Sequence, residues 1–203
     1  MSARQQAYIK ESDVNVPTPT AGRPRNYDLH PVMGFADQTV AYIVAALDEL
    51  SERLSDLIAD LPQDALDYIP EGTTNSIAML VVHVAWAEAS WVSRATGYPI
   101  PDDVEECLLP GKQGASGDLP VSSASTEELV ACCRVVRDRV TRPALAAVEG
   151  IDAQLETAGQ LTSLRQVLMH VIWHWIYHSG QVGLLRRLWG GTRYRWTFGQ
   201  PVS

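Results

Sequence analysis

Histidines are the residues of this 203-residue chain whose spacing most clearly suggests chemistry. His170, His174 and His178 follow one another at intervals of four residues, which places them along one side of a helix. A single helical histidine is usually a half-buried side chain that hydrogen-bonds to a neighbour. Several imidazoles on one face need a shared reason to lie in an apolar setting, and a divalent metal ion supplies one because it binds neutral imidazoles.

Helical geometry narrows the possible ligands. At about 100° per residue, His178 lies roughly 40° from the centre of the apolar stripe of its helix, His174 about 80° and His170 about 120°. His170 and His178 are also about 12 Å apart along the axis, too far to share one ion through bonds of ~2.1 Å. We therefore expect His174 and His178 to chelate the ion, with His170 outside. His83 borders the apolar stripe of another predicted helix and is a candidate third ligand.

Other reactive side chains have structural interpretations. Glu88 borders the same stripe as His83 but points about 140° away from it, so we interpret Glu88 as an ion-pair or capping partner. Cys132 and Cys133 have no cationic group placed to favour a thiolate, and we expect them to be small core residues. His30, in the N-terminal segment, is expected at the surface.

Four amphipathic segments are the elements that must position these side chains. They are residues 37–61, 73–97, 125–148 and 162–190, and strand-type alternation is nearly absent from the chain. Asp37 can cap the first helix, residues 73–75 the second, and Ser125 with Glu128 forms a capping box for the third. Pro143 is expected to kink or interrupt the third helix. Four long amphipathic helices predict an all-α four-helix bundle.

The bundle is expected to span residues 37–191, between an N-terminal arm of residues 1–36 and a C-terminal tail of residues 192–203. The arm is polar and rich in proline, whereas the tail carries aromatic residues that could pack on the bundle or on a partner subunit. Residues 99–124, between the second and third helices, have clustered proline and glycine and predict a long loop. That loop is either a lid over the site or a surface excursion without a role.

Composition excludes several classes of protein. The net charge of −8, from 16 basic and 24 acidic residues, argues against a nucleic-acid-binding surface. An apolar content of 46% is enough for a sizeable core, and no apolar run reaches the ~18 residues of a membrane span. The first ten residues lack the apolar core of a signal peptide, and the three cysteines suggest no disulfide framework. Both features predict a cytoplasmic location.

Two stretches of the sequence together resemble the DinB-like proteins. Residues 75–83, followed by Glu88 and Trp91, are similar to the second helix of that family. Residues 174–181 are similar to the fourth, in which the usual pattern is H-x-x-x-H-R-G-Q. Ser179 stands here in place of the arginine, so any anion contact which that arginine makes in relatives is not expected in this chain.

The resemblance covers about residues 37–190 and implies both a fold and a site. It implies a four-helix bundle that is commonly dimeric and holds a divalent metal on three histidines, at positions that match His83, His174 and His178. The ion would be zinc, nickel, iron or manganese. The implied activity is S-transfer or isomerisation, in which a small-molecule thiol of the bacillithiol or mycothiol type attacks an electrophile. A homodimer is expected, with the tryptophans of the fourth helix, Trp173, Trp175 and Trp189, as its seam.

Two alternatives remain open at this point. A metal-dependent hydrolase would need a positioned acid or oxyanion donor, and the nearby candidates are Tyr177, Gln181 and Glu88. A non-catalytic bundle that binds a metal or ligand during stress would need none of these. The sequence identifies no catalytic residue beyond the proposed metal ligands.

Overall fold

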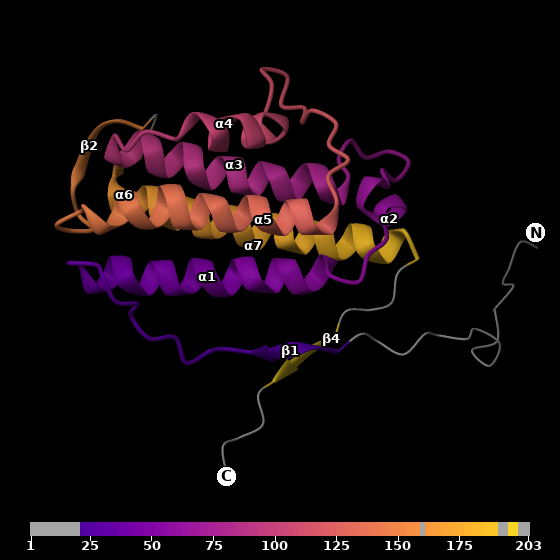
Figure 1. Ribbon diagram of the computed structural model, residues 1–203, viewed down its shortest axis with the longest axis horizontal. Coiled ribbons are helices and arrows are strands. Elements are labelled where there is room, and N and C mark those ends of the chain that lie inside the picture. Colours follow the sequence, from indigo (N-terminus) through magenta and orange to yellow (C-terminus); the bar gives the residue numbers. More distant parts are fainter. Residues whose placement is uncertain (1–20, 159–160, 191–194, 199–203) are drawn as a thin grey trace, which may run out of the picture.

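The computed structural model describes residues 21–158, 161–190 and 195–198. Four long helical segments lie side by side in a bundle (Figure 1). They are α1 (Gln38–Ile58), α3 (Ile77–Thr96), α5 (Thr126–Val136) with its continuation through the π-helical turn η2 (Arg137–Thr141) into α6 (Arg142–Ala146), and α7 (Leu164–Leu188). Shorter helices are α2 (Gln63–Asp67), α4 (Asp102–Leu108) and the 3₁₀ turn η1 (Leu109–Gly111). The predicted all-α four-helix bundle is confirmed.

Strands are confined to two small pairs within the described residues. β1 (Ala21–Arg25) pairs in parallel with β4 (Arg195–Phe198), and β2 (Gln154–Ala158) pairs antiparallel with β3 (Leu161–Ser163). The first pair therefore joins part of the predicted N-terminal arm to part of the predicted tail, beside α1 in Figure 1. Residues 1–20 of that arm, and residues 192–194 and 199–203 of that tail, lie outside the described residues.

Side-chain caps define most of the helix starts. The Asp37 carboxylate accepts hydrogen bonds from the backbone N–H groups of residues 39 and 40, and Ser125 with Glu128 forms the predicted reciprocal box. The second long helix starts later than predicted, after Ser76 rather than at residues 73–75. Before it, residues 70–73 form a turn in which the Thr73 N–H donates to the carbonyl of Pro70.

The segment between α3 and α5 is only in part a loop. Residues 102–111 form α4 and η1, which follow one another along the outside of α3. Asp102, Asp103 and Glu105 lie in the first turn of α4, where they complement the helix dipole, and Val104 and Leu108 are buried beneath the helix. Two buried side chains are too few to produce a recognisable helical period in the sequence.

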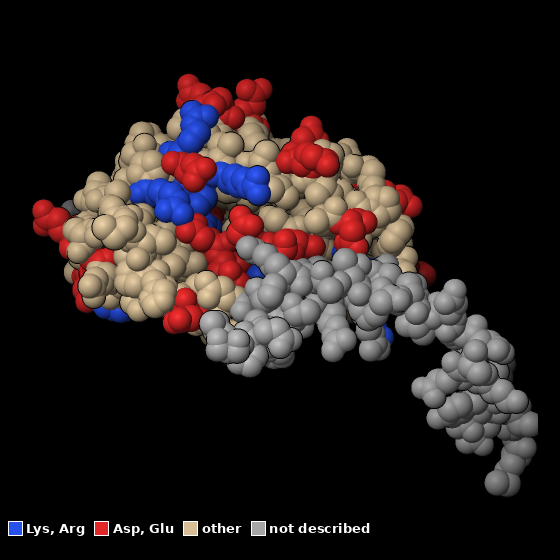
Figure 2. All heavy atoms as spheres, turned by 60° about the horizontal axis from the view of Figure 1, so that its bottom comes forward, with Lys and Arg blue, Asp and Glu red and all other residues tan. Residues whose placement is uncertain are grey.

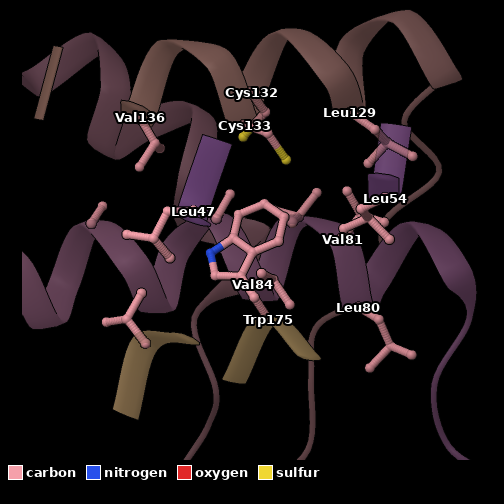
Figure 3. Packing of buried hydrophobic residues seen from close by; sticks show 14 of the residues in the cluster. Leu47, Leu54, Leu80, Val81, Val84, Leu129, Cys132, Cys133, Val136 and Trp175 are labelled. Carbon is pink, nitrogen blue, oxygen red and sulfur yellow. The ribbon is translucent and has the colours of Figure 1, made fainter. Parts of the chain in front are cut away.

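The hydrophobic core has a tryptophan at its centre. Trp175 of α7 is 1% exposed, and Figure 3 shows its ring amid side chains from α1, α3 and α5, among them Leu47, Val84 and Val136. Cys132 and Cys133 lie on the core side of α5 and are buried, as predicted. Trp175 is the largest fully buried side chain among the described residues, and it belongs to a cluster to which every long helix contributes.

A buried carboxylate lies beside this tryptophan. Glu88 of α3 accepts two hydrogen bonds of 2.8 Å from Arg137, one of 2.7 Å from the Trp175 indole N–H and one from the Thr141 hydroxyl. Burial alone would raise the pKa of Glu88, but the Arg137 charge and these hydrogen bonds outweigh it and hold the pKa below its usual value. Arg137 also donates to Asp48 of α1 at 2.8 Å. The ion-pair interpretation of Glu88 is confirmed.

The π-helical turn explains how one segment supplies two of these donors. Pro143 has no N–H to donate and would crowd the preceding turn of a regular α-helix. The chain adopts the wider turn η2 just before this proline and then continues as α6, so the helix is not broken. Arg137 and Thr141, at the two ends of η2, both reach the Glu88 carboxylate.

The surface view in Figure 2 shows acidic side chains spread over most of the visible face, while the basic ones in view lie mainly in one group that acidic side chains surround. Ion pairs on the surface include Arg142 with Asp48, and Arg139 with Asp103. The described part of this face therefore presents no continuous basic stripe. Among the described helices, none combines the length and apolar character that crossing a bilayer requires.

Replacing Glu88 by glutamine tests the buried network. Glu88→Gln keeps the volume but leaves the Arg137 guanidinium buried without its main counter-charge, so we expect the free energy of unfolding to fall by about 3 kcal/mol. Urea unfolding followed by far-UV circular dichroism measures the change. The control is Asp152→Asn, which removes an equally bidentate but exposed partner of Arg165. Equal losses of stability in the two variants would contradict the central position given to Glu88.

Candidate metal centre

Three histidines from two helices converge beside the core. His83 lies on α3, His174 and His178 lie on α7, and one ring nitrogen from each falls within 4.8 Å of those from the other two. The Nε2 atoms of His83 and His174 are 3.1 Å apart, and the ring centroids of His174 and His178 are 4.4 Å apart. The structure thus brings together the three histidines that the sequence singles out.

Hydrogen bonds on the outer side of the cluster orient two of the rings. The His83 Nδ1–H donates to the backbone carbonyl of Gly111 at 2.9 Å, and the His178 Nδ1–H donates to the side-chain carbonyl of Gln181 at 2.6 Å. Each bond places the ring proton on Nδ1 and so leaves the lone pair of the ring on Nε2, which in His83 faces the Nε2 atom of His174. Metal-binding histidines commonly have this arrangement, in which a carbonyl or carboxylate fixes the tautomer and increases the basicity of the ligand.

All three imidazoles are neutral at ordinary pH. Burial, together with the nearby rings of His178, His83 and His170, lowers the pKa of His174 to about 3. Burial likewise lowers the pKa of His83 and of His178, against the opposing hydrogen bonds of Gly111 and Gln181. Neutral imidazole is the form that binds a cation, so the protein holds these side chains ready for a metal without first removing protons.

The donor set fits a divalent ion. The 3.1 Å between the two Nε2 atoms is less than twice a metal–nitrogen bond of ~2.1 Å, so one ion can reach both. Three nitrogen ligands suit zinc, nickel, iron and manganese alike, and they leave room for a further ligand. That an ion binds there stays a prediction.

Other sequence candidates lie outside the cluster. His170 packs edge-on against Trp91, with ring centroids 4.8 Å apart, and is not part of the group of three. Tyr177 is 63% exposed, with its ring 5.1 Å from that of His178. The hydroxyl oxygen of Ser179 is buried without a hydrogen-bond partner in the described structure. His30 is at the surface, as predicted.

Gly111 is the functional position that the sequence did not reveal. A Cβ atom at this residue would lie 2.4 Å from the carbonyl oxygen of Val82 and 2.9 Å from the backbone nitrogen of His83. Only glycine lets η1 approach α3 closely enough for its carbonyl to accept the His83 proton. The single hint in the sequence is the Pro110–Gly111 pair, which marks a turn but not what the turn contacts.

An alanine at Gly111 tests this outer contact. In Gly111→Ala the added methyl group must push η1 away from α3, so His83 loses its acceptor and we expect metal affinity to fall roughly 10- to 100-fold. Competition with a chromogenic chelator measures that affinity. Gly114→Ala is the matched control, because a Cβ there meets its nearest neighbour at an ordinary 3.6 Å. A metal affinity unchanged in Gly111→Ala would show that the carbonyl does not support the site.

The sequence of the chain is similar to one protein family and to one protein of Bacillus subtilis. The sequence model of the mycothiol-S-transferase family matches residues 42–191, which is more than half of the chain and includes all three clustered histidines. The chain is also 26% identical over 155 residues to the uncharacterized protein YkkA of Bacillus subtilis (strain 168), covering 74% of this chain and 88% of YkkA. The family match and the helical bundle together confirm the resemblance to the DinB-like proteins that the sequence shows. The chain belongs to the mycothiol-S-transferase family, one of the DinB-like families.

Proposed function

We propose that this protein is a metal-dependent transferase that activates a low-molecular-weight thiol of the mycothiol type and transfers its sulfur to an electrophile. The observation that carries the proposal is the convergence of three neutral imidazoles whose free nitrogens lie within 4.8 Å of one another. The name of the matching family supports the choice of thiol. Such a role suits the reducing cytoplasm, and the three cysteines of the chain are free thiols.

Different residues would bind the ion and orient its ligands. His83, His174 and His178 would hold the ion, and Gly111 and Gln181 fix the rings of His83 and His178. When bound, the ion supplies a Lewis acid that favours the deprotonated, nucleophilic form of a thiol at neutral pH. Because the three imidazoles are neutral, they leave the positive charge of the ion undiminished. His174 and His178 are only half-buried, so a small molecule can approach the cluster from outside the bundle.

The contacts of the site weigh against the hydrolase alternative. Glu88 is fully committed to Arg137, Trp175 and Thr141 in the core. Gln181 is engaged with His178, which leaves Tyr177 as the one sequence candidate for a proton donor near the cluster. A thiolate attacking an electrophile whose leaving group departs as a stable anion needs no such acid, because no leaving atom has to be protonated. The site therefore suits thiol activation better than hydrolysis.

We also propose that the protein forms a homodimer through the outer face of α7. Exposed apolar residues recur along this helix with helical spacing: Met169, Trp173, Ile176, Tyr177, Leu184 and Leu188. Trp173 is the most exposed residue of this face, at 66%, whereas Trp175 is in the core and cannot belong to the seam expected from the sequence. An apolar stripe of this length on a monomer is typical of a surface that a partner covers.

Metal content and turnover test the proposed function. After purification and incubation with metal, we expect His174→Ala to contain little bound ion and to show no turnover, because two ligands hold an ion poorly. Elemental analysis measures the metal content. His170→Ala is the control and should keep both, since His170 packs against Trp91 instead. In the wild type, reaction of a fluorogenic alkylating electrophile should require both metal and thiol, and mycothiol should exceed glutathione.

Three results would contradict this proposal. Metal lost from His170→Ala but kept by His174→Ala would reject the ligand set. Metal-dependent cleavage of an ester without added thiol would favour the hydrolase. Stable metal binding without turnover, across both thiols and several electrophiles, would favour the non-catalytic bundle.

Sedimentation velocity tests the dimer. A charge within the apolar face should prevent two copies from packing, so Trp173→Arg is expected to sediment as a monomer while the wild type sediments as a dimer. Val121→Arg is the control, because Val121 is also an exposed apolar residue but lines the cavity beside α4 and α5. A wild-type protein that is monomeric at all concentrations would overturn the proposed interface.

A further inference from the structure

Two cysteine thiols lie in contact outside the histidine cluster. The Sγ atom of Cys107, on α4, is 3.3 Å from that of Cys132, on α5. A disulfide bond is about 2.05 Å long, so an approach of about 1.2 Å between the two short stretches of helix would suffice. Cys133 is the neighbour of Cys132 in the sequence, but its thiol is buried in the core, where burial raises its pKa to about 12.

An open cavity gives small molecules access to this pair. The cavity has a volume of about 670 Å³, and its lining includes Cys107, Cys132, Val82 and Pro110. Cys107 is exposed, whereas Cys132 is 5% exposed, and burial together with the neighbouring thiols raises its pKa. Cys107 is therefore the thiol that meets an oxidant first, and Cys132 lies behind it.

The same segment that carries Cys107 also carries the acceptor for His83. α4 runs directly into η1, and Gly111, four residues after Cys107, accepts the His83 Nδ1–H. Gly111 is packed so closely on the backbone of Val82 and His83 that it has no room for a Cβ. Because α4 continues directly into η1, we expect a shift of α4 toward α5 to displace the Gly111 carbonyl relative to the His83 ring.

We propose that Cys107 and Cys132 form a reversible disulfide on exposure to a hydroperoxide, and that this bond weakens the metal site through Gly111. The thiolate of Cys107 attacks one peroxide oxygen, the O–O bond breaks, and Cys107 becomes a sulfenic acid as water or an alcohol leaves. The Cys132 sulfur then attacks the Cys107 sulfur, the S–O bond breaks, and the released hydroxide takes the Cys132 proton as water. The two thiols lose two electrons in total, and the peroxide gains them.

Mass spectrometry of the full chain tests the bond itself. After treatment with stoichiometric hydrogen peroxide and alkylation of the remaining thiols under denaturing conditions, the wild type should lose two hydrogen atoms and keep only Cys133 free for alkylation. A peptide map should join Cys107 to Cys132, and a reductant should reverse the change. Cys107→Ser and Cys132→Ala should form no disulfide, whereas the control Cys133→Ala should form it as the wild type does.

Zinc affinity tests the coupling, which rests on the proposed metal function. Oxidised wild type should bind zinc roughly 10-fold or more weakly than the reduced protein, the size of effect that follows loss of an outer contact to a ligand. Cys107→Ser treated with peroxide should bind zinc as the untreated protein does.

Each other outcome overturns part of the proposal. Sulfinic acid at Cys107 with Cys132 still free, or disulfides between two chains, would reject the intramolecular bond. A disulfide with unchanged zinc affinity would reject the coupling and leave the metal site intact. A reduced protein that binds no zinc would reject the proposed function and with it the coupling, while the peptide map would still decide the disulfide.

Discussion

The Glu88 carboxylate is buried where α1, α3, α7 and the π-helical turn meet, and a buried charge must be matched by fixed donors or carry a heavy desolvation cost. The donors come from different segments, so the bundle satisfies Glu88 only in one relative arrangement of its helices. Apolar packing tolerates small slips between helices, whereas a bidentate guanidinium and an indole N–H do not. The polar network in this way selects one register from the several that the core alone would allow.

The histidine cluster depends on that register. His83 precedes Glu88 by five residues on α3, and His178 follows Trp175 by three residues on α7. Because the two helices run in opposite directions, the bond between Trp175 and Glu88 sets His178 and His174 opposite His83. A shift of α7 by one turn, about 5.4 Å along the axis, would separate His174 and His178 from their present positions; in one direction it would set His170 and His174 opposite His83 instead, because the three histidines recur about once per turn. The site is thus positioned by a contact in which no histidine takes part.

Much of this arrangement could be predicted from the sequence, because it follows from helical periodicity. Apolar spacing located the four long helices, the four-residue interval put His174 and His178 on one face, and burial separated them from His170. What could not be predicted depends on contacts between distant segments. The turn η2 precedes Pro143 and provides two hydrogen-bond donors to Glu88. The helix α4 has too few buried residues to produce a helical period in the sequence. Gly111 contributes a backbone carbonyl, and because every residue type has one, the sequence does not show which carbonyl will contact His83.

The backbone carbonyl of Gly111, as the acceptor for His83, affects how the family can evolve. An acceptor that belongs to the main chain is kept when side chains elsewhere in its segment are exchanged, provided that residue 111 remains a glycine, so the orientation of the His83 ring is shielded from most other mutations there. Residues around the contact, including those that line the cavity, are therefore free to change in charge and shape. The geometry of the metal ligands is kept because it depends on the path of the backbone. A family could in this way vary what its members accept as substrates without rebuilding the metal centre each time.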